Sequence, residues 1–441
     1  MTRYCFLLLA FLFLLVGCSE NTPVPPIPEE QPRFTYDIVK ASGFPVVSIH
    51  LEDRNATITK TEKLPATIRV QWEGQEDQEF SSPITIKGRG NSTWDLMRKK
   101  SYTISFDSKT EILGMAKSKK WVLIANHTDK SLMRNLYASY LGNTIYSREW
   151  NPSFRVVELF LSGSYKGTYI LGESIKIDKK RVNIPDVSEP LSEWKDANGD
   201  GIVDLYDGGF LLEINERMDE KRNFRSTHGV AFSLKDPDEV SEEVFSHIKG
   251  IVDNTEAALF GPNFQDTETG YASVLDVDSL VDWYLMNEFA KNKDAKFFSS
   301  VYLYYSPSDG RLHMGPNWDF DIAYGNVAGT PAADSEGFWI LDTPWFSRLF
   351  EDPAFVEKVQ TRWNETKTDL LLSITDWIPS MEEFLTPTAN LNFSRWKILG
   401  SPVWPFASGY SKRKTYSSEV AFLQTWLLDR YIWFDEAINK L

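Results

Sequence analysis

The pattern of apolar and polar positions predicts a strand-rich first part of the chain. Between residues 36 and 106, short runs that alternate in polarity or stay apolar end at turn residues, which is typical of β-strands. The predicted strands are residues 46–51, 66–72, 83–88 and 101–106. Two more are predicted at residues 155–163 and 165–173, and the turn residues Ser162-Gly163-Ser164 predict that this pair forms a hairpin.

Helical spacing of apolar residues first appears at residues 131–143 and dominates after one further predicted strand at residues 208–214. The later helices are predicted at residues 241–260, 278–292, 352–372 and 417–441. Asp352 is a suitable N-cap, and Pro353 suits the first helical position after it. We therefore predict an α+β fold, with a β-rich part over residues 34–175 and a mostly helical part over residues 176–441.

The N-terminal segment has the pattern of a secretory signal. An apolar run over residues 6–16 follows Arg3 and is shorter than the roughly 20 residues that span a bilayer. The sequence LVGC at residues 15–18 resembles a bacterial lipobox, in which the cysteine receives the lipid. We predict a signal peptide over residues 1–17, lipidation of Cys18 and a proline-rich tether over residues 18–33. The alternative is an ordinary signal peptide that contains a cysteine.

The predicted anchor, the net charge and the cysteines indicate where the chain is located and which partners and sites are not expected. The lipid would anchor the chain in the bacterial cell envelope, at the outer membrane or cell surface of a Gram-negative cell, and would be its only contact with the membrane. A formal net charge of -15 argues against a nucleic-acid partner. The two cysteines, Cys5 and Cys18, fall in the predicted signal and at its cleavage site, so a disulfide or a cysteine-based zinc site is not expected.

Three segments carry a family resemblance. They are IKGRGNSTW at residues 86–94, with WVLIANHTDKSLMRN at 121–135 after it; VELFLSGSYKGTYILGE at 157–173; and NEFAKNKDA at 287–295 followed by GPNWDFDIAYGN at 315–326. In this order they resemble the CotH kinase family, the spore-coat protein H proteins. The resemblance implies an atypical protein-kinase-like fold of two lobes that hold ATP and a metal ion, and phosphorylation of protein serines. The signature motifs of ordinary protein kinases are missing from the sequence.

The resemblance also suggests where the chemistry lies. Phosphoryl transfer needs a carboxylate near the attacking hydroxyl and oxygen ligands for Mg²⁺ or Mn²⁺. Asp294 stands where the family has its catalytic aspartate. Asp319, in the sequence Asp-Phe-Asp, resembles a kinase metal-binding element and is assigned as the principal ligand, with Asp321 and Asn292 as further ligands. The alternatives are a capped turn for Asp319 and Asp321, and a solvated helix end for Asn292 and Asp294.

Nucleotide and phosphate contacts are expected from five further residues. A guanidinium grips phosphate oxygens in pairs, whereas an ammonium acts as a point charge. The candidates are Arg89, Asn91, Lys100, Arg134 and Glu173. The alternatives are a solvated hairpin around Arg89 and a sheet edge closed by Glu173.

An acidic stretch over residues 196–207 has the spacing of a calcium loop. Oxygen ligands at positions 1, 3, 5, 7, 9 and 12 of such a loop would be Asp196, Asn198, Asp200, the Ile202 carbonyl, Asp204 and Asp207. Gly201 occupies the sixth position, where the turn must be sharp. We predict a structural Ca²⁺ site, with an acidic surface turn as the alternative.

These observations give one leading function and two rivals. The leading function is metal- and ATP-dependent transfer of a phosphoryl group to serine or threonine hydroxyls of an envelope or secreted protein. The first rival is an envelope lipoprotein that binds a surface protein or glycan without catalysis. The second is a transferase that uses another phosphate donor.

Overall fold

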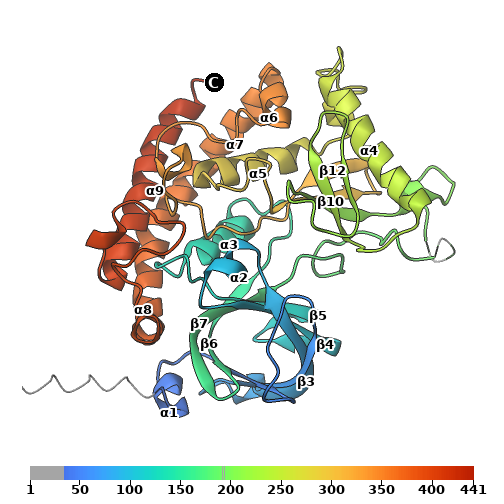
Figure 1. The fold of residues 1–441 in the computed structure, drawn as a ribbon. Helices are drawn as coiled ribbons and strands as arrows, with labels where there is room; N and C mark the ends of the chain where they lie inside the picture. The colour runs from blue at the N-terminus through green and yellow to red at the C-terminus, as the bar shows by residue number, and fades with distance from the viewer. Residues whose placement is uncertain (1–33, 191, 193) are drawn as a thin grey trace, which may run out of the picture. The chain divides into compact units, whose positions relative to one another are not determined.

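A closed seven-stranded barrel forms the first part of the chain in this computed structural model, which describes residues 34–441 except 191 and 193 (Figure 1). The predicted signal peptide, Cys18 and the tether lie outside the described residues. The order around the barrel is β1-β2-β3-β4-β5-β7-β6, and β1 closes it by pairing in parallel with β6. The strands are β1 (Val46–Leu51), β2 (Leu64–Gln71), β3 (Phe80–Arg89), β4 (Ser101–Ile112), β5 (Met115–Ile124), β6 (Phe154–Leu161) and β7 (Ser164–Glu173).

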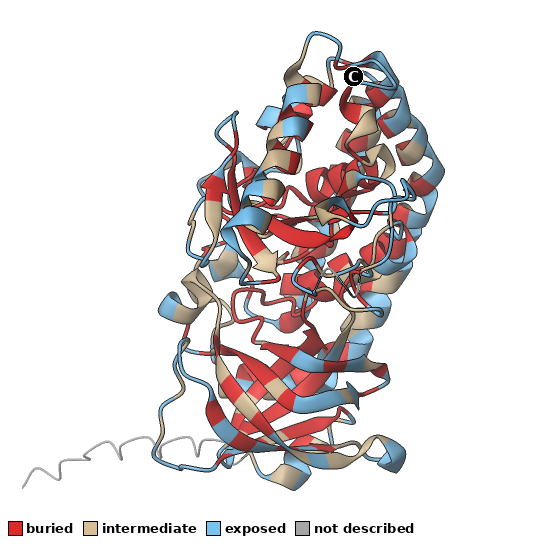
Figure 2. Cartoon of the chain, turned by 90° about the vertical axis from the view of Figure 1, so that its right-hand side faces the viewer, coloured by how far each residue is buried: buried red, intermediate tan, exposed pale blue. Residues whose placement is uncertain are grey.

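Alternation of side chains fills the barrel. Along β2, Leu64, Ala66, Ile68 and Val70 are buried, and the residues between them are exposed. The inward residues of the other strands join them in one apolar core (Figure 2). Closure by the β1–β6 pair leaves this sheet without a free edge.

The predicted hairpin is confirmed. β6 and β7 pair antiparallel from Phe154–Gly172 to Leu161–Ser164. Ser162 and Gly163 both have positive φ, 49° and 78°, which is the backbone of the two-residue turn that suits the twist of a hairpin.

The second part is built on a five-stranded antiparallel sheet with the order β12-β11-β8-β10-β9. Its strands are β8 (Phe210–Ile214), β9 (Asn223–Arg225), β10 (Ala231–Asp236), β11 (Val301–Ser306) and β12 (Arg311–Met314). All five residues of β8 are buried, as expected for a central strand. The α+β class and the β-rich N-terminal half are thus confirmed.

The helices lie mostly in the C-terminal part, and the first two lie at the barrel (Figure 1). They are α1 (Tyr36–Lys40), α2 (Ser92–Leu96), α3 (Arg134–Thr144), α4 (Glu242–Phe260), α5 (Val277–Ala290), α6 (Pro344–Leu349), α7 (Pro353–Leu372), α8 (Ile378–Arg395) and α9 (Tyr416–Ile438). The predicted start of α7 is confirmed, because the Asp352 side chain accepts a hydrogen bond from the Ala354 N–H at 3.0 Å. Over the described residues, no helix has the length and apolar character needed to cross a membrane.

Helix α5 lies at the centre of the second part. Every residue from Ser279 to Ala290 is buried, and α7 and α9 pack against it. Within this core, Glu288 of α5 and Arg430 of α9 form an ion pair of 2.9 Å in which both side chains are fully buried. Arg430 also donates to the backbone carbonyls of Glu288, Phe289, Ser335 and Gly337. One arginine therefore joins α9, the end of α5 and residues 335–337.

Replacing Arg430 by methionine should destabilise the fold strongly. The buried Glu288 carboxylate would lose its ion-pair partner and keep only the hydrogen bonds from the Trp339 and Ile340 N–H groups, and breaking a buried pair in this way costs about 3–5 kcal/mol. Urea denaturation at pH 7 would measure the loss. Lys440→Met, which removes an exposed ion pair with Glu436, is the matched control and should leave the unfolding midpoint unchanged. Equal midpoints for Arg430→Met and the wild type would contradict this account of the core.

Candidate functional site

A cleft of about 250 Å³ lies where the end of the barrel meets the second part of the chain. The loops after β3 and β5 line it from the barrel side, and residues after β8, α5 and β12 line it from the other. Its walls carry many charged groups. The acidic ones are Glu213, Asp219, Glu220, Asp294, Asp319 and Asp321, and the basic ones are Arg89, Lys99, Arg217 and Lys235.

Asp294 reaches the cleft because α5 ends just before it. Lys291 takes a left-handed conformation (φ 41°) and turns the chain out of the helix. The Asp294 carboxyl is 8% exposed and accepts a hydrogen bond from the Ser299 hydroxyl at 3.3 Å. Burial, followed by the nearby charge of Asp319, raises the pKa of Asp294 to about 6.

Asp319 and Asp321 enter the cleft from the segment after β12. The Ser300 hydroxyl donates to Asp319 at 3.4 Å, and the Thr128 hydroxyl donates to Asp321 at 2.6 Å. Burial raises the pKa of both carboxyls, and the charge of Asp319 raises that of Asp321 further. Over the described residues, the carboxyl oxygens of Asp294, Asp319 and Asp321 do not all lie within 4.8 Å of one another, so one ion would not contact all three in this arrangement.

The backbone around these carboxyls is strained. Asp319 and its hydrogen-bond donor Ser300 have φ of 66° and 60°, in the left-handed region that costs a non-glycine residue about 1–2 kcal/mol. Strain of this kind persists where surrounding contacts enforce it, and it is concentrated at functional sites.

Residues 126–135 supply many of those contacts, because they hold the segment 319–326 in place. Asn135 accepts a hydrogen bond from the Phe320 N–H at 2.8 Å, and Arg134 donates to the carbonyls of Ala323 and Tyr324. Arg134 is itself buried and paired with Asp129 at 2.6 Å. The structure thus places Arg134 behind the cleft, where it positions the segment that carries Asp319 and Asp321.

The other predicted phosphate contacts fall into two groups. Arg89 and Asn91 line the cleft, where the Arg89 guanidinium lies 4.9 Å from the centre of the Trp318 ring. Lys100 lies outside the described cleft lining, and its ammonium donates to the Trp94 carbonyl. The neighbouring residue, Lys99, contributes to the cleft lining, but its buried ammonium donates to the carbonyls of Ala125 and Thr168 and to the Asn392 side chain.

Glu173 and Asn292 also lie outside the described lining of the cleft. Glu173, at the end of β7, accepts a hydrogen bond from the Ser153 N–H at 3.0 Å. The Asn292 amide donates to the Asn287 side chain at 3.3 Å, and its oxygen accepts from the Asp294 N–H at 3.4 Å. Asn292 therefore closes the end of α5 and holds the backbone of Asp294 through this hydrogen bond.

Sequence reasoning missed several residues of the cleft. Glu213 accepts from the Ser300 N–H at 2.8 Å and pairs with Lys235 at 2.9 Å. Arg217 donates to the Ser299 hydroxyl at 2.9 Å, next to Asp294. The sequence carried no clear signal for them, because only Glu213 lies in the strand, whereas Asn215 and Arg217 follow it, with Arg217 in a turn.

His127 is a further cleft residue that the sequence did not single out. It is 8% exposed, and burial, followed by the nearby charge of Lys99, lowers its pKa to about 3. Its Nδ1 is buried and has no hydrogen-bond partner among the described residues. A neutral imidazole with an unpaired nitrogen at a cleft is suited to a polar ligand.

The predicted calcium loop is separate from the described cleft lining. Its side chains accept hydrogen bonds from the loop's own backbone: Asp196 from Gly199 and Gly201, and Asp207 from Ala197 and Asn198. Among the described residues, no three carboxylates of this loop have oxygens within 4.8 Å of one another. Calcium binding here stays a prediction.

Comparison with known proteins identifies a family. A family model described as CotH kinase protein matches residues 86–434. No curated protein matches the chain. The matched range contains every charged residue of the cleft named above.

Stability should depend on the protonation of Asp294. Because its pKa is raised from an ordinary 3.8 to about 6, the folded state binds this proton more tightly than the unfolded state. Stability therefore falls as pH rises from about 4 to about 6 and stays lower by about 3 kcal/mol above that range. Asp294→Asn should then be more stable than the wild type at pH 8 in EDTA, with a gain that disappears near pH 3.5.

Urea denaturation across this pH range would measure the difference. Asp77→Asn, at an exposed position, is the matched control and should follow the wild type at every pH. A stability difference for Asp294→Asn that does not change with pH would contradict the assignment.

Proposed function

The chain belongs to the CotH kinase protein family, and from this premise we propose that it transfers the γ-phosphoryl group of ATP to a serine or threonine hydroxyl of a protein. The observation that carries the proposal is that the buried Asp294 and Asp321 and the half-buried Asp319 lie beside one cleft that also holds Arg89 and Arg217. Carboxylates for a base and a metal, together with cations for phosphate, are the parts that phosphoryl transfer needs.

The donor set of the cleft fits Mg²⁺ or Mn²⁺. Six carboxylates face four lysines and arginines, and burial raises the pKa of each of the three aspartates because their ionised forms lose hydration, which a bound cation would offset. Hard divalent ions prefer carboxylate oxygens. Asp319 and Asp321 would hold the ion, which would neutralise charge on the phosphate oxygens.

The remaining residues act directly on the reactants. Asp294 accepts the proton of the attacking hydroxyl as the general base. The hydroxyl oxygen forms a bond to the γ-phosphorus while the bond to the bridging oxygen breaks, and ADP leaves. Arg89 and Arg217 offset phosphate charge from opposite sides of the cleft. His127 offers its unpaired Nδ1 to the nucleotide.

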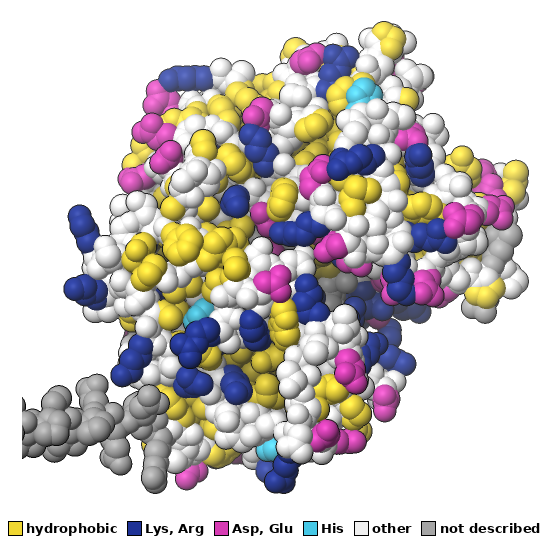
Figure 3. All heavy atoms as spheres, viewed as in Figure 1, with side chains coloured by type: hydrophobic (Ala, Val, Ile, Leu, Met, Phe, Trp, Pro, Cys, Tyr) yellow, Lys and Arg dark blue, Asp and Glu magenta, His cyan; other side chains and the backbone are white. Residues whose placement is uncertain are grey.

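The barrel and the second part would act as the two lobes of a kinase-like fold. Arg89, Asn91 and His127 come from loops at one end of the barrel, whereas Asp294 and Asp319 come from the second part. On the face seen in Figure 3, lysine and arginine side chains gather over the barrel and around the hollow above it. The cleft itself has more carboxylates than lysines and arginines, so a bound cation would have to offset them before the site favours a polyanionic nucleotide.

The proposed location is the bacterial cell envelope, with the lipid on Cys18 as the anchor and an envelope or secreted protein as the substrate. ATP is scarce outside the cytoplasm, so the nucleotide would have to be supplied externally or locally. A phosphotransferase that uses another donor would employ the same carboxylates. A binding protein without catalysis would need the cleft but not Asp294 as a base.

The direct test is incubation of the soluble chain from residue 19 with γ-labelled ATP, Mg²⁺ or Mn²⁺, and envelope proteins. We expect metal-dependent labelling of protein serine or threonine, and a loss of about 10²- to 10⁴-fold in Asp294→Ala, because the general base is removed. In Asp319→Ala, added Mg²⁺ or Mn²⁺ should no longer stimulate labelling. Asp77→Ala, at an exposed position, should retain full activity. Suppose that Asp319→Ala binds nucleotide as the wild type does, and that the wild type labels no protein. This outcome would favour the function as a binding protein without catalysis.

The loop at residues 196–207 is proposed as a structural Ca²⁺ site. Millimolar Ca²⁺ should raise the melting temperature of the wild type, because an ion that binds the folded state stabilises it. Asp200→Ala should lose this shift, and Asp238→Ala, an exposed aspartate outside the loop, should keep it. Equal shifts in both variants would mean that the loop does not hold the ion.

A further inference from the structure

Glu149, Asp276 and His313 form a cluster apart from the described cleft lining. One ligand atom from each lies within 4.8 Å of the other two, which holds for no other group of three histidine, cysteine or acidic residues in the described part of the chain. Glu149 precedes β6, Asp276 is the N-cap of α5, and His313 lies on β12. Three elements distant in sequence thus bring a nitrogen and two carboxylates together.

The imidazole of His313 is oriented as in a metal site. Its Nε2 lies 3.0 Å from an Asp309 carboxylate oxygen, and its ring stacks on Tyr304 with the centroids 4.9 Å apart. The Tyr304 hydroxyl in turn donates to Glu149. A histidine that ligates a metal nearly always donates its other N–H to a carboxylate, carbonyl or water. Asp309 fills that role, which leaves Nδ1 directed toward Glu149 and Asp276.

The spacing around Nδ1 suits an ion. It lies 3.0 Å from Glu149 Oε1 and 3.9 Å from Asp276 Oδ1. Neighbouring ligands of a tetrahedral ion bound at about 2.05 Å are about 3.3 Å apart. A small shift of these side chains would therefore place all three at bonding distance from one ion.

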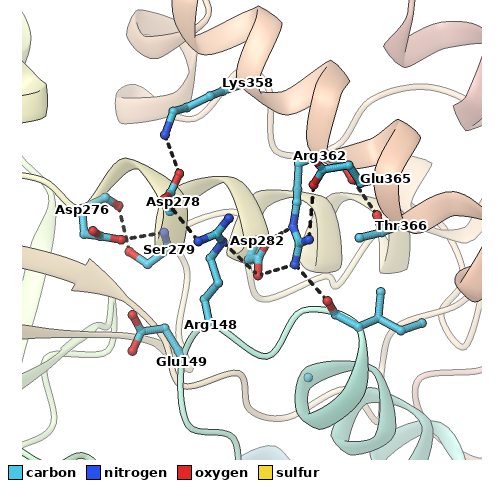
Figure 4. A network of polar contacts seen from close by, with 12 residues as sticks. Arg148, Glu149, Asp276, Asp278, Ser279, Asp282, Lys358, Arg362, Glu365 and Thr366 are labelled. Atoms are coloured by element: carbon cyan, nitrogen blue, oxygen red, sulfur yellow. Dashed lines mark hydrogen bonds and ion pairs between the residues drawn. The ribbon is translucent and has the colours of Figure 1, made fainter.

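The cluster also has an excess of negative charge. Glu149, Asp276 and Asp309 all have His313 as an ion-pair partner. Arg148, the residue next to Glu149, turns toward Asp278 at 3.2 Å and Asp282 at 3.9 Å (Figure 4). The charge of Arg148 thus offsets Asp278 and Asp282 of α5. A cation bound at the cluster would offset the excess negative charge of the cluster itself.

We propose that His313 Nδ1, Glu149 and Asp276 bind a divalent transition-metal ion, for which Zn²⁺ is the best fit. A ligand set that includes imidazole favours Zn²⁺ over Mg²⁺ and Ca²⁺. Glu149 and Tyr304 also line a surface pocket of about 210 Å³, so one of the three ligands borders a cavity at the surface.

The ion would fix two segments that run toward the cleft. Two residues after Glu149, the Asn151 side-chain oxygen accepts hydrogen bonds from the Asn317 N–H at 2.9 Å and from the Asn317 amide at 3.1 Å. Asn317 lies between His313 and Asp319 in the chain. Metal binding would therefore stabilise the connection from β12 to Asp319 without taking part in chemistry there, and it does not depend on the proposed kinase activity.

Zn²⁺ titration of tag-free, chelator-treated protein against a chromophoric competitor would test the site. We expect a bound equivalent in the wild type that is retained in Asp319→Asn, together with a rise in melting temperature. His313→Gln should weaken this binding by at least about 100-fold, and Asp309→Asn by about 10- to 100-fold, because the histidine loses its orienting partner. His50→Gln, at an exposed histidine, is the matched control and should bind like the wild type.

Glu149→Gln, which keeps the shape of the side chain, provides a second ligand variant if His313→Gln does not fold. Wild-type affinity in a folded His313→Gln, or in Glu149→Gln, would overturn the proposal. So would the absence of a Zn²⁺-dependent rise in the melting temperature of the wild type. Loss of Zn²⁺ binding in Asp319→Asn but not in His313→Gln would place the ion in the cleft instead. Failure of the kinase assay would leave each of these results unaffected.

Discussion

The buried contact between residues 126–135 and residues 319–326 is the constraint on which the cleft depends. The first segment leaves the barrel after β5, and the second follows the last strand of the second part. Arg134 and Asn135 bind the backbone of the second segment, and Thr128 binds Asp321 directly. Because Arg134 is buried with Asp129, neither segment can move independently without exposing or isolating a charge. These two segments carry much of the family resemblance. Their hydrogen bonds to each other therefore set the position of the residues that would contact a ligand.

This contact allows the fold to bury carboxylates that water would otherwise have to hydrate. Asp319 holds a left-handed backbone, and Asp294 and Asp321 are almost fully buried. Each of these features opposes folding, and the hydrogen bonds from Ser299, Ser300 and Thr128 offset them only in part. An ion that binds the folded state would remove much of the remaining cost. The protein is therefore least stable when the carboxyls of the cleft are ionised, which is the form that would bind a cation.

Local structure could be predicted from the sequence, and long-range structure could not. The turn at residues 162–164 and the start of α7 follow from nearest-neighbour chemistry, and both are confirmed. Closure of the barrel depends on β1 pairing with β6, more than a hundred residues later, and no local pattern encodes that pairing. The same limit applies to the candidate site. Asp294 and Asp319 were singled out through the resemblance, whereas the place of Arg134 behind the cleft depends on hydrogen bonds to the carbonyls of Ala323 and Tyr324, far along the chain, which no local pattern encodes.

Charge operates in this molecule over short distances. The chain as a whole carries a net charge of -15, which would repel a nucleotide if it acted as one field. At physiological ionic strength, charges more than about 8 Å apart in solvent are largely screened from one another. A bound phosphate would therefore respond to Arg89, Arg217 and any ion held by Asp319, and hardly to acidic residues on distant helices. The negative net charge is consequently compatible with the proposed binding of a nucleotide, provided that the ion binds with or before it.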